Sequence, residues 1–214
     1  VAIVCADFND PDVLELMNSD LPVVTIDYVH HNCTAVSSNN IQGMEDLVKY
    51  IYGQGHRKIA YIHGQQASYV TKDRLASFYR TVDELGLKIP DEYIRTADYL
   101  ETREAAKQTK ELLNLEDPPT CIIYPDDTSL IGGRNVIIEM GLRIPQDISI
   151  AGYDGTRMSQ LLHPQLTTIR QDTELIGSEA AKRLIGSIEK PRTTLVERVV
   201  IEGILVAGKS VGRI

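Results

Sequence analysis

The chain contains few cysteines, and their placement argues against a metal site. The three cysteines, Cys5, Cys33 and Cys121, are far apart, and each lies in or near an apolar run. Isolated cysteines in apolar surroundings are typical of reduced, packed thiols in a cytosolic protein. Because no Cys-x-x-Cys spacing is present, the sequence predicts neither a bound metal nor a cofactor held by these residues.

Clustered basic residues are also missing. The sequence has 22 Lys and Arg against 30 Asp and Glu, which gives a net charge of −8. The densest basic segment is His56-Arg57-Lys58. A surface that binds DNA needs clustered Lys and Arg to displace counterions. We therefore expect that this chain by itself does not bind nucleic acid.

Several sequence motifs are absent, and each absence removes a class of function. No apolar run approaches 18 residues, so no transmembrane helix is expected. No Gly-x-Gly-x-x-Gly follows a strand, and neither a P-loop nor a Gly-x-Ser-x-Gly elbow is present. What remains is a chain of 214 residues, 43% apolar and 24% charged. This composition is ordinary for a soluble protein with a substantial core, and a cytoplasmic location is expected.

Strand-like and helix-like patterns alternate along the chain. Strands are predicted at 1–6, 21–26, 35–37, 58–63, 93–97, 120–124, 148–152 and 166–169, with two more between 195 and 206. Helices are predicted at 10–17, about 40–52, 71–85, 102–115, 129–140 and 174–188. This alternation predicts an α/β fold of mainly parallel sheets flanked by helices. The strands are too many for one comfortable sheet, and no Gly/Ser-rich linker separates them, so two lobes with more than one chain crossing are expected.

One predicted strand ends in an acid, and it is the most informative segment of the chain. Residues 147–155 read Asp-Ile-Ser-Ile-Ala-Gly-Tyr-Asp-Gly. In an open α/β sheet, ligands bind at the carboxyl ends of the strands. Asp154 therefore either caps a turn or holds a polar ligand, and the segment alone leaves both roles open.

Other polar residues also fall at the ends of predicted strands. They are Asp27, Ser38, Tyr99 and the Asp126-Asp127 pair, and Arg74 follows the strand that ends at Gly64. Carboxylates can accept hydrogen bonds from vicinal hydroxyls, and an arginine donates rigid, paired bonds to the same ligand. Asp127 is the exception, because its place between a strand and a helix predicts a helix N-cap. His63 is a candidate for the same crevice, although a structural role for it is the more common case.

Four segments of the sequence, and the position of one arginine, resemble transcriptional repressors of the LacI/GalR type. Residues 55–64, Gly-His-Arg-Lys-Ile-Ala-Tyr-Ile-His-Gly, look like the family's GHR-x-IA-x-I-x-G segment, and Arg74 lies where that family has an effector-binding arginine. Pro125-Asp126-Asp127 resembles its x-N-D segment. Residues 141–154 closely match GLRVPQDISVVGYD, and residues 164–171 match P-x-LTTI-x-Q. The resemblance covers essentially the whole chain, in order.

The resemblance implies a two-lobed effector-binding domain like that of periplasmic sugar-binding proteins. The first lobe would contain residues 1–38 and 172–197, and the second 40–169 and 201–214. Val1 would fall on the third strand of the first lobe, so the DNA-binding headpiece and the first part of that lobe would be missing from this chain. Seven residues would line the effector cleft or the loop over it: Arg74, Tyr99, Asp126, Asp154, Ser38, Ser68 and Val70.

The family also implies partners and a mechanism. The effector would be a sugar or a sugar derivative, and operator DNA would be bound through a headpiece outside this chain by a homodimer. Ligand binding would change the relative orientation of the two lobes. The sequence departs from the family pattern at Ser38, where an acid is usual, and at Asp126, where Asn is usual. Losing one acid and gaining another implies that a contact to a ligand hydroxyl has moved.

Two other functions are compatible with the same residues. One is a periplasmic or secreted sugar-binding protein of the same fold, which an upstream signal sequence would favour and a helix-turn-helix would exclude. The other is a glycosidase that uses Asp126 and Asp154, since that chemistry needs two carboxylates about 5–10 Å apart. The repressor-type pattern favours a binding domain without enzymatic activity.

Overall fold

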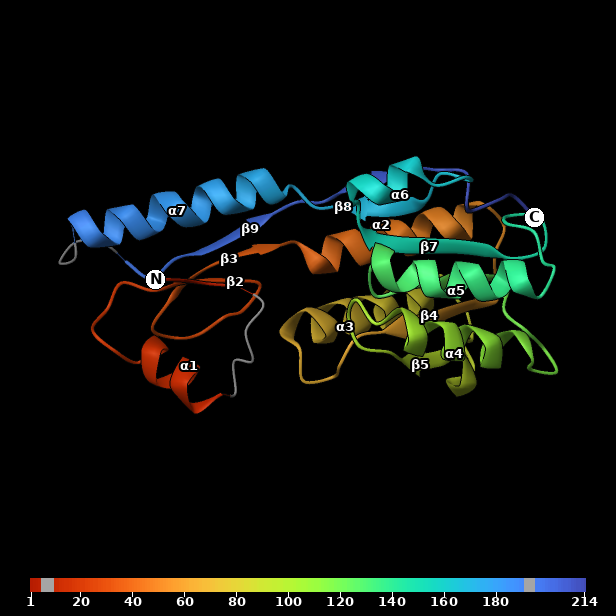
Figure 1. The fold of residues 1–214 in the computed structure, drawn as a ribbon, viewed down its shortest axis with the longest axis horizontal. Helices are drawn as coiled ribbons and strands as arrows, with labels where there is room; N and C mark the ends of the chain where they lie inside the picture. The colour runs from red at the N-terminus through yellow and green to blue at the C-terminus, as the bar shows by residue number, and fades with distance from the viewer. Residues whose placement is uncertain (5–9, 191–194) are drawn as a thin grey trace. The chain divides into compact units, whose positions relative to one another are not determined.

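The chain folds into two compact units that each contain their own sheet. The computed structural model describes residues 1–4, 10–190 and 195–214 (Figure 1). Unit 1 is formed by Val1–Asn39 and Asp172–Gly203, and unit 2 by Asn40–Gln171 and Ile204–Ile214. The chain therefore passes from one unit to the other three times. Cys5 lies outside the described residues, and the predicted strand 1–6 is described only through Val4.

Unit 1 has a four-stranded parallel sheet in the order β1-β2-β3-β9. These strands are β1 (Ala2–Ile3), β2 (Val24–Ile26), β3 (Thr34–Ser38) and β9 (Arg198–Ile201). Helix α7 (Thr173–Glu189) packs Ile176 and Ala180 against Val24 and Val36. Helix α1 (Pro11–Met17) packs Met17 in a second cluster, which contains Val23 of the chain just before β2. Since neighbouring residues of an extended chain point to opposite faces, the two helices cover opposite faces of this sheet.

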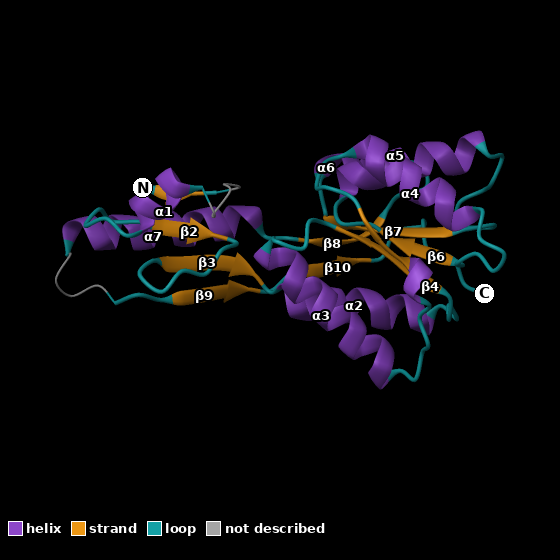
Figure 2. Ribbon diagram, turned by 90° about the horizontal axis from the view of Figure 1, so that it is seen from below, coloured by secondary structure: helices purple, strands orange, loops and turns teal. Residues whose placement is uncertain are grey.

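Unit 2 has a six-stranded sheet in the order β10-β8-β7-β6-β4-β5. The parallel strands are β4 (Ile59–His63), β5 (Ile94–Thr96), β6 (Cys121–Ile123), β7 (Ser149–Asp154) and β8 (Thr167–Arg170). The edge strand β10 (Ile204–Val206) runs antiparallel to β8. Figure 2 shows α2 (Asn40–Gly53) and α3 (Tyr69–Glu84) on one face of this sheet, and α4 (Thr102–Leu113) and α5 (Asp127–Glu139) on the other.

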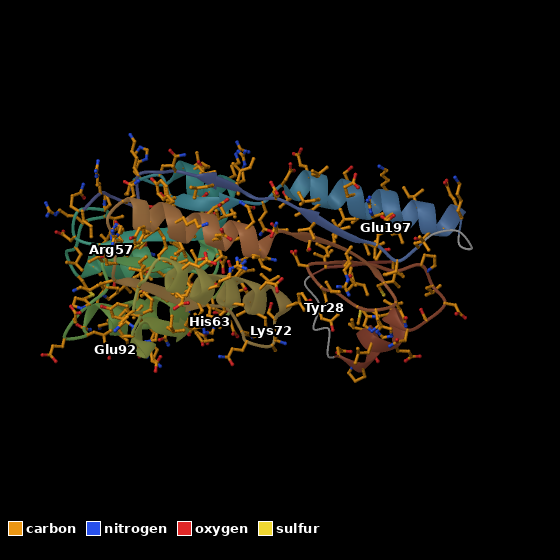
Figure 3. The ribbon with its side chains drawn as sticks, turned by 180° about the vertical axis from the view of Figure 1, so that it is seen from behind. Tyr28, Arg57, His63, Lys72, Glu92 and Glu197 are labelled. Carbon is orange, nitrogen blue, oxygen red and sulfur yellow. The ribbon has the colours of Figure 1, made fainter. Side chains whose placement is uncertain are left out.

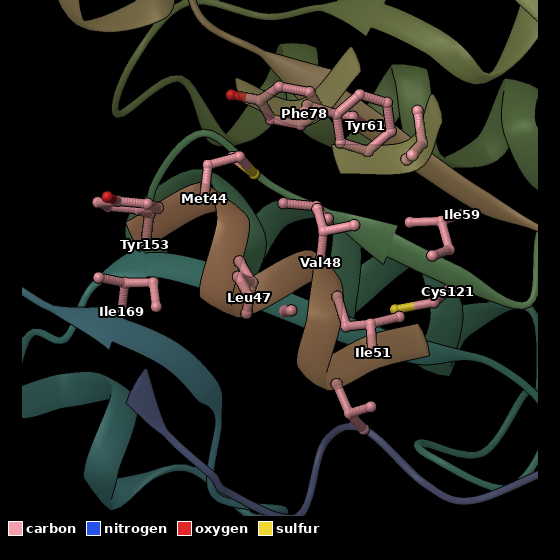
Figure 4. Close-up of a cluster of buried hydrophobic side chains, with 14 residues drawn as sticks. Met44, Leu47, Val48, Ile51, Ile59, Tyr61, Phe78, Cys121, Tyr153 and Ile169 are labelled. Carbon is pink, nitrogen blue, oxygen red and sulfur yellow. The ribbon is translucent and has the colours of Figure 1, made fainter. Parts of the chain in front are cut away.

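The larger core of unit 2 lies between its sheet and helices α2 and α3 (Figure 4). Helix α2 contributes Met44, Leu47, Val48 and Ile51, all fully buried. Their spacing of three and four residues puts them on one face of a helix. The strands present Ile59, Tyr61, Ile123, Tyr153 and Ile169 to that face. The sequence predicted this apolar face of α2, and the structure confirms it.

Helices α4 and α5 approach each other so closely that glycine is required. A Cβ atom at Gly132 of α5 would lie 1.9 Å from the carbonyl oxygen of Thr102, at the start of α4. A Cβ atom at Gly133 would lie 2.1 Å from the Tyr124 hydroxyl. That hydroxyl is hydrogen-bonded to Thr109 Oγ1 of α4 at 2.7 Å. The pair of glycines therefore sets the distance between the two helices and the sheet.

The α/β fold class predicted from the sequence is confirmed, with small differences in element boundaries. Helix α3 begins at Tyr69, two residues before the predicted start. The short helix α6 (Arg157–Leu161) and the 3-10 turn at Asp91–Tyr93 were not predicted. Cys33 and Cys121 are buried free thiols, and burial raises the pKa of both. No helix among the described residues is long and apolar enough to cross a bilayer.

Candidate ligand-binding site

The carboxyl ends of the parallel strands of unit 2 lie at one edge of its sheet. Strand β4 is followed by Gly64, β6 by Tyr124 and Pro125, and β7 ends at Asp154. Parallel strands in register bring these ends together, which is where α/β sheets bind ligands. His63 lies at the end of β4 (Figure 3), where it is buried and its Nδ1 donates to the Gly64 carbonyl oxygen at 2.7 Å. It therefore has a structural partner.

Arg74 of α3 is buried at this edge and held by several contacts. Its side chain is 3% exposed. Nε donates to Asn40 Oδ1 at 2.8 Å, and Nη1 donates to the Pro125 carbonyl oxygen at 2.9 Å. The guanidinium carbon lies 3.4 Å from the centre of the Tyr153 ring, a cation–π contact. Nη2 lies 3.8 Å from Asp154 Oδ1, which is ion-pair range but too long for a hydrogen bond.

Asp154 faces this guanidinium from the end of β7. Its backbone has φ 96°, a left-handed value that is rare outside glycine. Gln171 holds it twice, since Nε2 donates to Asp154 Oδ1 at 2.6 Å and the backbone N–H donates to the Asp154 carbonyl oxygen at 3.1 Å. A strained backbone that neighbouring contacts maintain is common at ligand sites. The Asp154 side chain remains 31% exposed and is therefore accessible.

Tyr99 supplies an aromatic face in the loop between β5 and α4. A Cβ atom at Gly64 would lie 2.2 Å from the Tyr99 ring, so the ring rests directly on the Gly64 backbone. The hydroxyl is hydrogen-bonded to Thr71 Oγ1 of α3 at 2.8 Å. Burial raises the pKa of Tyr99, so the hydroxyl stays protonated near neutral pH. The ring is thus held by Gly64 and the hydroxyl by Thr71, and the residue is half-buried.

Asp126 and not Asp127 is the N-cap of α5, so that sequence prediction was wrong. Asp126 has an extended backbone, and its Oδ1 accepts from the Ser129 N–H at 2.7 Å. Its Oδ2 accepts from Ser129 Oγ at 2.7 Å and from the Leu100 N–H at 2.9 Å. All three partners donate, which suits a carboxylate better than an amide. The buried Asp126 therefore caps the helix and anchors the loop that carries Tyr99.

Asp127 lies in the first turn of α5 and holds the loop that follows Asp154. Its Oδ2 accepts from the Thr156 N–H at 2.7 Å, and its Oδ1 accepts from Thr168 Oγ1 at 2.8 Å. A Cβ atom at Gly152 would lie 2.4 Å from Oδ1, so glycine in β7 lets the carboxylate approach. Burial raises the pKa of Asp127 to about 6, although the bonds from Thr168 and Thr156 oppose this shift.

Asp127 gives a prediction for the pH dependence of stability. Its folded pKa of about 6 lies above its ordinary value of 3.8, so the folded state favours the protonated form. The resulting stability is present below pH 3.8 and is lost as the pH rises through 6. Relative to Asp127→Asn, the wild type should lose about 2 kcal/mol of unfolding free energy between pH 4 and 6. Urea unfolding of both proteins across this range measures the difference, and a constant difference would contradict it.

The remaining predicted site residues lie on three elements. Ser68 is the N-cap residue of α3, and Val70 is in the first turn of that helix and not in a loop. Both precede Thr71, the partner of Tyr99. Ser38 ends β3 in unit 1, where its N–H donates to Asp27 Oδ1 at 3.2 Å. Unit 2 therefore brings together the residues predicted at Arg74, Tyr99, Asp126 and Asp154, while Ser38 belongs to the other unit.

The sequence did not indicate the residues that hold Arg74 and Asp154 in place. Asn40 and Gln171 are 34 and 17 residues away from their partners, and no local pattern marks such distant bonds. Tyr153 could have been found, since it directly precedes Asp154 in the segment already singled out. Its ring points to the α2–α3 face of the sheet, as the strand alternation requires.

The fold and this edge define the chain as a ligand-binding domain of the open α/β type. A family model described as a periplasmic binding protein-like domain matches residues 48–211. The HTH-type transcriptional repressor PurR of Aliivibrio salmonicida is 31% identical over 190 residues, which are 87% of this chain and 57% of that protein. The probable HTH-type transcriptional repressor ExuR of Bacillus subtilis is 28% identical over 88% of this chain and 57% of its own length.

Solved structures agree with these relatives. The putative transcriptional regulator LacI from Bacillus cereus subsp. cytotoxis superposes with a TM-score of 0.88 at 27% identity, over 94% of this chain and 72% of that one. A CelR–cellobiose complex (TM-score 0.90, 24% identity, 98% and 65% covered) and a LacI family regulator from Enterococcus faecium with bound ribose (0.88, 21%, 100% and 80%) share the fold. The chain therefore belongs to the periplasmic binding protein-like domain family. Within that family it is of the type that forms the effector-binding domain of LacI/GalR regulators.

This membership confirms the resemblance seen in the sequence. The chain spans 57% of the length of the two curated repressors that it matches. Those relatives are repressors and not enzymes, in agreement with the expectation that the chain has no enzymatic activity.

Proposed function

We propose that this chain binds a sugar or sugar derivative as the effector of a transcriptional repressor. The observation that carries the proposal is the geometry of Arg74 and Asp154. The described contacts of Arg74 use Nε and Nη1 and leave Nη2 beside the Asp154 carboxylate. A donor and an acceptor side by side match two adjacent hydroxyls, one accepting and one donating.

Tyr99 supports a ring-shaped ligand at the same edge. A fixed aromatic face suits the apolar side of a sugar ring, while its hydroxyl is occupied by Thr71. Asp126 is better assigned to support of this ring than to direct ligand contact, because three protein donors already bind its carboxylate. The CelR–cellobiose complex and the Enterococcus faecium regulator with bound ribose have the same fold.

The repressor function follows from the relatives and is part of the proposal. We expect operator DNA to be bound by a headpiece outside this chain, in a cytoplasmic homodimer. The expectation that the ligand controls the relative orientation of the two lobes also stays a prediction. Both would be tested on the full-length protein by operator binding with and without the ligand.

Calorimetric titration of the 214-residue chain tests the binding proposal. The panel contains D-ribose, cellobiose and, as a second chemical class, hypoxanthine and guanine. We expect saturable heat with at least one sugar and none with the purines. If the chain is folded by circular dichroism but gives no heat with any sugar, the result would count against a sugar effector. Heat with a purine alone would show that the effector is a purine and not a sugar.

The two alternatives receive less support. A glycosidase would need Asp126 free to act as acid or nucleophile, but its oxygens cap α5 and bind the Leu100 N–H. A periplasmic binding protein shares the fold, but the curated relatives are HTH-type repressors. Release of product from a chromogenic glycoside would revive the first alternative.

A further inference from the structure

The acceptor that holds Arg74 is the first residue of unit 2. Asn40 begins α2, directly after the chain enters this unit. Its Oδ1 accepts from Arg74 Nε at 2.8 Å. Both residues are buried, since Asn40 is 5% exposed and Arg74 is 3% exposed. Helices α2 and α3 pack side by side on the same face of the sheet (Figure 2). One hydrogen bond therefore connects the entry of the chain into unit 2 with the guanidinium at the ligand edge.

This bond decides how the guanidinium is oriented. A guanidinium is planar, and two acceptors on different nitrogens fix its plane and its rotation within that plane. The acceptors here are Asn40 Oδ1 on Nε and the Pro125 carbonyl oxygen on Nη1. The Tyr153 ring supports the flat face. With these three contacts in place, the remaining nitrogen, Nη2, lies beside the Asp154 carboxylate.

We propose that Asn40 is a positioning residue for ligand binding, acting through Arg74. It does not need to touch the ligand, since its acceptor oxygen fixes the plane in which Nη2 is offered. The inference rests on the proposed role of Arg74 in binding. Removal of the acceptor leaves a buried N–H without its partner and lets the guanidinium turn about its remaining contacts. Ligand affinity should then fall even though every ligand-contacting side chain remains.

Two substitutions separate positioning from a general loss of stability. Asn40→Leu has a similar size but no acceptor. Asn40→Asp keeps an acceptor and places an acid at a helix N-terminus, where it is favourable. Gln171→Met is the control for the exchange experiment alone, because Gln171 binds Asp154 and not the Arg74 Nε.

The first readout is proton exchange at Arg74 Nε–H, which needs no ligand. NMR of the ¹⁵N-labelled chain identifies this resonance by its loss in Arg74→Lys, with the half-exposed Arg80 as the reference for free exchange. We expect exchange at Arg74 to be slower than at Arg80 by at least about 100-fold in wild type, Asn40→Asp and Gln171→Met, as a bond worth ~3 kcal/mol requires. In Asn40→Leu, exchange at Arg74 should become at least about 10-fold faster than in the wild type, because the N–H loses its acceptor while its burial remains. Equal protection in Asn40→Leu and wild type would overturn the proposal.

The second readout is calorimetric affinity for D-ribose and cellobiose. For a sugar that binds wild type, we expect a loss of about 10-fold in Asn40→Leu and less than about 3-fold in Asn40→Asp. An equal loss in both variants would contradict positioning through the acceptor. If neither sugar binds wild type, these effectors are wrong, while the exchange experiment still decides the role of Asn40.

Discussion

Replacing Gly132 with alanine is expected to lower the unfolding free energy of the protein by about 3 kcal/mol or more. Alanine normally stabilises a helix interior relative to glycine by about 1 kcal/mol. Here the new methyl group would lie 1.9 Å from the Thr102 carbonyl oxygen and within 3 Å of the Thr102 Cα and carbonyl carbon. These atoms belong to the backbone, so no side-chain rotation relieves the clash. Helices α4 and α5 must move apart, which opens the core between them.

Tyrosine signals make this effect measurable in unit 2. The chain has no tryptophan and 10 tyrosines, and all except Tyr28 lie in unit 2. Near-ultraviolet circular dichroism during urea unfolding therefore follows this unit. Gly53→Ala is the control, since Gly53 ends α2 and a Cβ there meets nothing within 4 Å. We expect that variant to match or slightly exceed the wild type, and a loss below about 1 kcal/mol in Gly132→Ala would refute the argument from close approach.

Replacing Arg74 with lysine is expected to weaken binding of the effector by at least about 100-fold while the chain stays folded. Lysine keeps the charge but lacks the planar fork. One ammonium group cannot bond Asn40 Oδ1 and the Pro125 carbonyl oxygen as Arg74 does and also present a donor beside Asp154. It also loses the flat contact with Tyr153. The loss should therefore exceed that of a single hydrogen bond.

Arg80→Lys provides the matched control on the same helix. Arg80 is 49% exposed and pairs with Glu45 and Glu84 at the surface. Exposed pairs contribute little, so its affinity should stay within about 2-fold of the wild type. Titration of both variants with the sugar that binds the wild type measures the contrast. Wild-type affinity in Arg74→Lys would remove Arg74 from the binding site.

The sequence predicted well where local pattern decides the structure. The spacing of Met44, Leu47, Val48 and Ile51 predicts the buried face of α2, and the helix predicted at 10–17 is present as α1 (Pro11–Met17). Glycines and motif segments located the strand ends. The carboxyl-edge rule for α/β sheets then grouped residues from separate strands into one candidate site.

Local pattern failed where a backbone angle or a distant partner decides. Asp126 and Asp127 are chemically identical neighbours, and only the extended backbone of Asp126 makes it the cap. Asn40 holds Arg74 and Gln171 holds Asp154 through hydrogen bonds between distant segments. Nothing in the local sequence indicates that these residues are partners. The backbone of Asp154, with φ 96°, also has no local signature, and the bond from the Gln171 N–H to its carbonyl oxygen comes from 17 residues away.

The route of the chain through unit 2 has a consequence for its synthesis. Strand β10 closes the sheet against β8, and the following tail supplies the Gly212 carbonyl oxygen to His56 Nε2 at 3.0 Å. Both belong to Ile204–Ile214, which follows all of the described part of unit 1 in the sequence. A nascent chain on the ribosome therefore carries unit 2 with an open edge along β8 until Ile204–Val206 emerge. Open strand edges favour aggregation, so truncation just before Ile204 should yield insoluble protein even though every residue of the candidate site has been translated.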